Sequence, residues 1–165
     1  MELLKKRILK EGRAEKGDIL KVNGFINHQV DPKLMKEMAK DIVEHFQNSM
    51  ITKVATIESS GISPAIFVAD LLNVSMVIMK KQPSKLIYSD LFQTIVQSYT
   101  KGVSYELTVS KKYISEEDNI LIVDDFLANG EAARGAIRLV EMSGASVAGV
   151  AVLIEKAFQA GREKL

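Results

Sequence analysis

The sequence predicts an α/β domain with a mostly parallel central sheet flanked by helices. Three observations support this class: short apolar runs suited to buried strands, amphipathic helical patterns between them, and polar or glycine-containing loops directly after the strands. The chain has 165 residues, of which 47% are hydrophobic, so it is long enough to fill one core. We therefore expect a single domain.

Charge and residue usage exclude several classes of function. The 22 Lys and Arg residues nearly balance the 21 Asp and Glu residues, so no global basic field would recruit nucleic acid. The sequence has no cysteine, which excludes disulfides, thiolate catalysis and cysteine-ligated zinc. Residues 1–7 are too charged for a signal peptide, and no apolar window is long enough to span a membrane. We expect a cytoplasmic protein that binds neither nucleic acid nor membranes.

The first thirty residues predict small, mostly polar elements. A basic helix over residues 2–11 ends at Gly12, and a polar turn covers residues 14–18. A short apolar strand at residues 19–22 leads to a tight turn at Asn23 and Gly24. Residues 25–30 then mix aromatic, amide and imidazole groups in a way that core packing would not require.

The rest of the chain alternates strands with helices. Asp31 and Pro32 are suited to the N-cap and first position of a helix, whose apolar side chains recur up to Phe46 at a helical spacing. A second helix begins at Ser63. Strands are expected at residues 53–57, 74–79, 104–111, 120–123 and 146–154. Residues 82–103 have only partial strand character and are interpreted as a mobile lid.

The strongest functional pattern follows the apolar run at residues 120–123. Asp124 and Asp125 come directly after this strand, then a small-residue turn at residues 127–130, then a helix. Backbone N–H groups at a helix N-terminus are unpaired and lie at the positive end of its dipole, so a phosphate fits there. The two acids can accept hydrogen bonds from neighbouring hydroxyls, as on a ribose. The stretch predicts a ribose 5-phosphate site, and the alternative is an ordinary strand, turn and helix with exposed acids.

Other polar groups are expected at the same edge of the sheet. The loop at residues 58–62 follows a strand, and its backbone N–H groups are suited to a second anion such as pyrophosphate. Lys80 and Lys81 end the next strand, where they either meet an anionic substrate or are simply solvated. Lys156 follows the last strand and faces the same edge.

Residues 120–135 resemble the 5-phosphoribosyl 1-pyrophosphate (PRPP) signature of the type I phosphoribosyltransferase family. Nearly the whole chain resembles the members of that family that act on xanthine, most specifically over residues 20–32, 51–53, 56–61, 124–130 and 154–156. The resemblance implies the type I phosphoribosyltransferase fold. It implies a hood at residues 1–30, a core at 31–158 and a lid at 82–103, with the family's C-terminal segment missing after residue 165.

The resemblance also implies roles for individual residues. Asp124 and Asp125 would be catalytic and bind the ribose hydroxyls. Residues implied to bind PRPP are Ala128, Asn129, Gly130, Glu131, Ala132, Glu58, Ser59, Ser60, Gly61 and Lys81. Residues implied to contact xanthine are Leu20, Asn27, Lys156 and Phe126. The implied cofactor is Mg²⁺ carried by PRPP, without a protein metal site or an organic cofactor, and the implied assembly is a homodimer.

The implied reaction is phosphoribosyl transfer from PRPP to xanthine, which gives xanthosine 5′-monophosphate and pyrophosphate in purine salvage. Guanine or hypoxanthine as the base is one alternative, and a non-enzymatic sensor of PRPP or purines on the same fold is another. A phospho-acceptor receiver domain is disfavoured, because there the acid pair follows the first strand and here it follows a late one.

Overall fold

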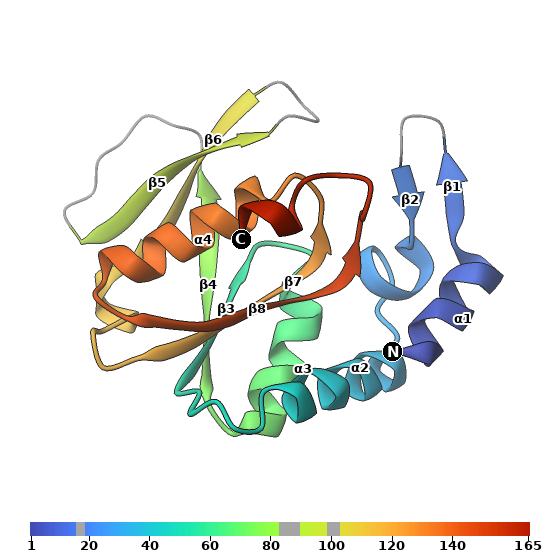
Figure 1. Cartoon of the computed structure of the whole chain (residues 1–165), viewed down its shortest axis with the longest axis horizontal. Helices are drawn as coiled ribbons and strands as arrows, with labels where there is room; N and C mark the ends of the chain where they lie inside the picture. The colour runs from blue at the N-terminus through green and yellow to red at the C-terminus, as the bar shows by residue number, and fades with distance from the viewer. Residues whose placement is uncertain (16–18, 83–89, 99–102) are drawn as a thin grey trace.

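The computed structural model describes residues 1–15, 19–82, 90–98 and 103–165, and a six-stranded sheet lies at its centre (Figure 1). The strand order is β5-β6-β4-β3-β7-β8. The four parallel strands are β3 (Lys53–Ile57), β4 (Ser75–Gln82), β7 (Asn119–Leu127) and β8 (Ser146–Glu155). Strands β5 (Leu91–Ser98) and β6 (Val103–Ser110) pair antiparallel and extend the sheet beyond β4. The predicted mostly parallel sheet is confirmed.

Helices cover both faces of this sheet. Helices α2 (Pro32–His45) and α3 (Ile62–Leu72) cover one face, with α1 (Glu2–Glu11) beside α2, and α4 (Glu131–Met142) covers the other (Figure 1). Strand β7 contributes Leu121 and Val123 to the first core and Ile120 and Ile122 to the second. Its continuous apolar run is therefore buried on both sides, as a central parallel strand requires.

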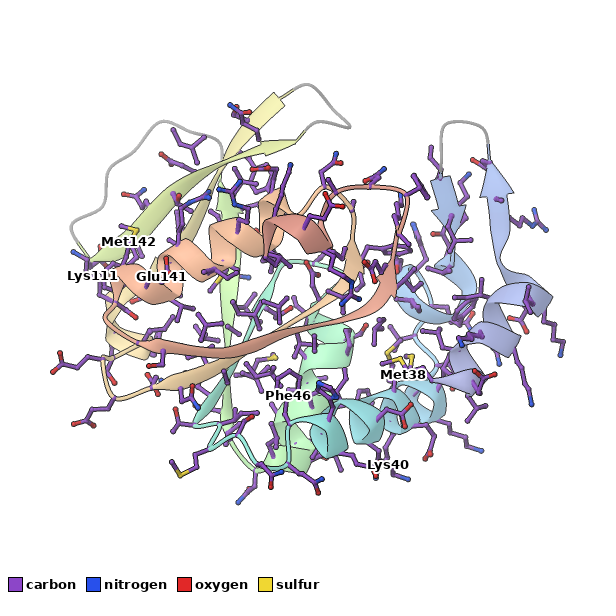
Figure 2. The ribbon with its side chains drawn as sticks, in the orientation of Figure 1. Met38, Lys40, Phe46, Lys111, Glu141 and Met142 are labelled. Atoms are coloured by element: carbon purple, nitrogen blue, oxygen red, sulfur yellow. The ribbon has the colours of Figure 1, made fainter. Side chains whose placement is uncertain are left out.

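The start of α2 follows the sequence prediction. Asp31 is the N-cap, its carboxylate accepts hydrogen bonds from two N–H groups of the first turn, and Pro32 is the first helical residue. Met35 and Met38 are buried, which confirms them as packing residues. Met38 points into the core, whereas Lys40 lies on the outer face of the helix (Figure 2).

The prediction of a polar turn was wrong at Ala14 and Glu15. These residues belong to β1 (Arg13–Glu15), which pairs antiparallel with β2 (Ile19–Lys21), while residues 16–18 lie outside the described ranges. All three residues of β1 are exposed, so no alternation of buried and exposed residues predicts the strand. The ladder depends on backbone pairing and on an ion pair of 2.7 Å between Lys21 and Glu15.

The prediction of a tight turn at Asn23 and Gly24 was also wrong. Residues 23–27 form a π-helical turn, η1 (Asn23–Asn27), in which the Phe25 and Ile26 side chains are fully buried. Both side chains join the core shared by α1, α2 and the end of β8. Core packing therefore does explain the apolar part of this stretch, and it fixes the hood to the sheet.

Two strands extend further than predicted at their carboxyl ends. Strand β7 continues through Asp124 and Asp125 to Leu127 because β8 still pairs with it there, and β4 continues through both lysines because β6 pairs with Lys80 to Gln82. The strand character expected within residues 82–103 belongs mainly to β5, and residues 83–89 and 99–102 lie outside the described ranges. No helix in the described ranges has the length and apolar character needed to cross a bilayer.

Candidate active site

The chain leaves the sheet in opposite directions after β3 and β7. The connection from β3 runs through α3 to β4, and the connection from β7 runs through α4 to β8, on the opposite face. The two strands pair only at residues 53–55 and 120–122, so they separate towards their carboxyl ends. Open α/β sheets bind ligands at such a switch point. The predicted acids and both predicted anion loops border this crevice.

Gly61 brings the loop after β3 into contact with the acid of β7. A Cβ atom built on Gly61 would stand 2.6 Å from Asp124 Oδ1, and it would also collide with the hydroxyl of Thr56. Thr56 is fully buried, and its Oγ1 has no hydrogen-bond partner among the described residues. Only a glycine permits this approach, which places the predicted pyrophosphate loop against the predicted ribose-binding acid.

Glu58 anchors that loop to β4. Its carboxylate accepts a hydrogen bond of 2.7 Å from the Lys81 backbone N–H and forms an ion pair of 3.2 Å with Lys80 Nζ. Its own N–H donates to the Met79 carbonyl at 3.0 Å, so that N–H cannot also hold an anion. Glu58 therefore positions the loop, and the anion-binding groups must come from the following residues.

The next three residues supply such groups. The peptide bond between Glu58 and Ser59 is cis. Within the described part of the chain, the N–H groups of Ser59, Ser60 and Gly61 have no recorded acceptor. Helix α3 begins directly afterwards at Ile62, so these N–H groups lie at its N-terminal end. Unpaired N–H groups at a helix start are suited to an anion.

The loop after β7 forms a second cradle at the N-terminus of α4. Gly130 is the N-cap of α4 with φ of +81°, a conformation that favours glycine. A cavity of about 130 Å³ lies there, and its lining includes Ala128, Asn129, Gly130, Glu131 and Ala132. All five residues predicted to bind the 5-phosphate therefore line one cavity.

Asp124 and Asp125 lie between the two cradles. The Asp125 N–H donates to Asp124 Oδ1, and the Phe126 N–H donates to Asp125 Oδ1, both at 2.9 Å. Burial, reinforced by the charge of Asp125, raises the pKa of Asp124 from 3.8 to about 8. A protonated Asp124 carboxyl can donate a hydrogen bond as well as accept one, so it can serve either side of a hydroxyl.

Tyr105 is a site residue that the sequence did not reveal. It lines the same 130 Å³ cavity from β6, and its ring centroid lies 5.6 Å from Lys81 Nζ. Burial, and then the charge of Asp124, raises the pKa of Tyr105. The charge of Lys81 in turn acts on Asp124. No motif marks Tyr105, because only the antiparallel register of β6 against β4 brings it to the site.

The residues predicted to contact the base lie on the hood side of the crevice. Leu20 and Phe126 are half-buried against the core that joins the hood to the end of β8. The Lys156 N–H donates to the Leu127 carbonyl at 2.8 Å, which places Lys156 beside the second cradle. Asn27 is exposed at the end of η1 and makes no side-chain hydrogen bond within the described ranges. Leu20 and Phe126 therefore pack against one core, and Asn27 directly follows two residues of that core.

The acid pair offers ligand atoms that would suit a divalent cation. Among the described residues, no three acidic or histidine side chains converge to form a metal site. Asp125 and Asp124 offer hard oxygen atoms at the edge of the crevice, which is the ligand type that Mg²⁺ prefers. They would hold the ion mainly through water and through the oxygens of the bound substrate.

A roomier cavity of about 640 Å³ opens at the other end of the sheet. It lies between β4 and β6, with Lys53 and Tyr113 in its wall, near the amino ends of the parallel strands. It contains neither the acid pair nor either anion loop. We therefore assign the candidate site to the crevice at the carboxyl ends.

The chain belongs to the phosphoribosyltransferase family, because the model of the phosphoribosyl transferase domain matches residues 27–164. Similar relatives carry a more specific name. Xanthine phosphoribosyltransferase 1 of Clostridium botulinum is 59% identical over 165 residues, which cover 100% of this chain and 87% of the relative. Xanthine phosphoribosyltransferase of Agathobacter rectalis is 58% identical over the same length and is covered to 86%.

Solved structures show the same fold. Adenine phosphoribosyltransferase from Rhodothermus marinus superposes with a TM-score of 0.81 at 27% identity, over 100% of this chain and 93% of that one. The type I phosphoribosyltransferase fold predicted from the sequence is confirmed.

Proposed function

We propose that this protein transfers the phosphoribosyl group of PRPP to xanthine, which produces xanthosine 5′-monophosphate and pyrophosphate in purine salvage. The observation that carries the proposal is the position of Asp124, which touches the Gly61 loop and lies on the strand that leads into the α4 cradle. A ribose with one phosphate at C5 and a pyrophosphate at C1 requires two anion-binding loops. Between them it requires carboxylates that hydrogen-bond to the ribose hydroxyls.

The residues of the chain would act mainly by position and charge. Asp124 and Asp125 would bind the ribose hydroxyls, Ala128 to Ala132 the 5-phosphate, and Ser59 to Gly61 the pyrophosphate, with Glu58 as the anchor of that loop. A nitrogen of the purine attacks C1 as the bond from C1 to the pyrophosphate oxygen breaks, and the base gives up its imidazole N–H proton to water. Because the leaving group gains negative charge, the loop N–H groups and Lys81 would stabilise the transition state. No covalent intermediate on the protein is needed.

The choice of xanthine depends on the base side of the site. Lys156 offers only hydrogen-bond donors, which suit the oxo groups of xanthine better than the exocyclic amine of adenine. Leu20 and Phe126 would pack against the ring, and Asn27 would hydrogen-bond to its edge. The similar relatives from C. botulinum and A. rectalis are named for xanthine, and the structural neighbour named for adenine is less similar in sequence.

Three further features follow from the family: the metal, the assembly and the division of the chain into segments. Mg²⁺ would enter bound to PRPP and would help to neutralise the pyrophosphate. The protein would work as a homodimer in the cytoplasm. The hood would span residues 1–30, the core residues 31–158 and the lid residues 82–103.

The direct test supplies the purified protein with PRPP, Mg²⁺ and xanthine and measures nucleotide and pyrophosphate together. The proposal predicts equal amounts of xanthosine 5′-monophosphate and pyrophosphate. A protein that bound PRPP tightly but released no pyrophosphate with any purine would instead be a sensor, and the enzymatic proposal would fail.

A further inference from the structure

The last ten residues fold back over the phosphate cradle of α4. The Lys156 N–H donates to the Leu127 carbonyl, directly before the cradle begins. Gly161 then lies against it: a Cβ atom on Gly130 would stand 2.9 Å from the Gly161 carbonyl oxygen, and a Cβ atom on Gly161 would collide with the Ala128 carbonyl oxygen. The short 3-10 helix η3 (Arg162–Lys164) follows. The C-terminal residues therefore contact successive parts of one loop.

The segment also contacts a negative charge, the Glu131 carboxylate, which by itself would oppose phosphate binding at this site. Glu131 is in the first turn of α4 and lines the 130 Å³ cavity, and its side chain is only 18% exposed. A carboxylate there competes with phosphate for the positive end of the helix dipole and repels it. An uncompensated Glu131 side chain would therefore weaken the phosphate binding that the backbone N–H groups of residues 128–132 are proposed to provide.

Lys164 compensates that charge. Its Nζ lies 3.1 Å from Glu131 Oε1 and donates a hydrogen bond to it, and its side chain is 33% exposed. Arg134 is the other cation near Glu131, but its Nη1 is 3.7 Å from the same oxygen and its side chain is more exposed. Lys164 thus makes the closer and more sheltered ion pair.

We propose that Lys164 is a positioning residue for PRPP: it holds Glu131 away from the phosphate and neutralises it, so that the N-terminus of α4 accepts the 5-phosphate. This inference rests on the proposed function, because it assigns the 5-phosphate to that cradle. Lys164 acts through Glu131 and not by touching the phosphate.

The test measures ligand binding to the full chain by calorimetry, with ribose 5-phosphate and inorganic pyrophosphate as separate probes. Lys164→Gln should weaken ribose 5-phosphate binding about fivefold, an effect typical of one charge at a helix N-terminus. Pyrophosphate binding should not change, because it uses the Gly61 loop. In steady-state assays the KM for PRPP should rise by a similar factor with little change in kcat, and Lys164→Arg should restore it.

A second variant separates neutralisation from direct contact. Glu131→Gln removes the charge that Lys164 balances, so adding Lys164→Gln to it should cause no further loss. If the double variant lost as much affinity as Lys164→Gln alone, Lys164 would contact the phosphate itself and the inference would be wrong. Normal ribose 5-phosphate binding by Lys164→Gln would also overturn it.

The control is Arg162→Gln, which removes the ion pair of the same segment with Glu155 and leaves Glu131 paired. It should bind ribose 5-phosphate normally. An equal loss in this variant would mean that the segment acts only as a structural brace, which contradicts the role of charge. If the unaltered protein bound neither PRPP nor ribose 5-phosphate, the proposed function itself would fail.

Discussion

Gly61 and Asp124 touch across the crevice between β3 and β7, with 2.6 Å between Asp124 Oδ1 and the position that a Cβ atom on Gly61 would take. Gly61 belongs to the loop whose N–H groups have no acceptor among the described residues, and Asp124 belongs to the acid pair. Their contact means that a ligand held by that loop lies next to the carboxylate. The proposed arrangement of pyrophosphate beside ribose depends on it.

Gly61→Ala should therefore abolish most PRPP use. The new methyl group cannot fit, so either the loop or the Asp124 side chain must move. A displacement of about 1 Å near the reacting groups can reduce kcat/KM by about 100-fold. Steady-state assays with PRPP varied would measure the loss.

The matched control is Gly24→Ala in the hood. A Cβ atom on Gly24 would meet no atom within 4 Å, so this variant should keep its activity. A Gly61→Ala protein with normal kcat/KM for PRPP would show that the loop does not need to approach Asp124.

Asp124→Asn should stabilise the unliganded protein at neutral and alkaline pH. The raised pKa of Asp124 means that folding keeps its proton while the unfolded chain loses it above pH 3.8. The free energy of unfolding therefore decreases as pH rises from 3.8 to about 8, and an amide, which does not ionise, removes this decrease. A gain of about 1 kcal/mol would raise Tm by about 2–4 °C in a chain of this size.

The measurement is Tm against pH for both proteins. The two curves should meet near pH 3.8 or below and should be furthest apart above pH 8. A constant difference across this range would mean that the ionisation of Asp124 is not the cause.

Asp118 lies far from the site, and Asp118→Ala should destabilise the protein. Burial acts to raise the pKa of Asp118, but hydrogen bonds from Lys53, Ser115 and Thr52 outweigh it and lower that pKa. Lys53 Nζ lies 2.7 Å from its carboxylate. This stability is present above the ordinary pKa of 3.8 and is lost as pH falls through the lowered value.

At neutral pH the Asp118→Ala substitution should cost about 2 kcal/mol of unfolding free energy, because partly buried donors lose their acceptor. Urea unfolding of both proteins would measure it. The difference should shrink in strong acid, and a difference that grew there would contradict the assignment.

Asp125→Asn should weaken PRPP use much more than xanthine binding. A charged carboxylate that binds a ribose hydroxyl contributes about 1.5–3 kcal/mol, so kcat/KM for PRPP should fall about 10- to 100-fold. Separate titrations of PRPP and xanthine in kinetic assays would distinguish the two. Equal losses for both substrates would count against the ribose role.

The sequence predicted those elements whose local residue pattern directly reflects their place in the fold. The run at residues 120–123 is apolar because both faces of β7 are buried, and Asp31 with Pro32 starts α2 by capping alone. The acid pair and Gly130 were also visible, because a phosphate cradle needs a glycine turn directly after a strand.

Other features depend on pairing between distant segments. Strand β1 is exposed along its length and exists through its register with β2, which no local pattern encodes. Tyr105 reaches the cavity only because β6 turns back along β4. The contact of Lys164 with Glu131 spans thirty-three positions of the chain and follows from the fold of the C-terminal residues.

A comparison of four bases would show whether xanthine is the acceptor. The assay would measure kcat/KM for xanthine, guanine, hypoxanthine and adenine at saturating PRPP and Mg²⁺, in the unaltered protein and in Lys156→Ala. Xanthine should be the preferred base, adenine should be the poorest substrate, and Lys156→Ala should reduce the preference for xanthine. A higher kcat/KM for any other base would show that xanthine is not the natural acceptor, and an unchanged xanthine preference in Lys156→Ala would remove Lys156 from base recognition.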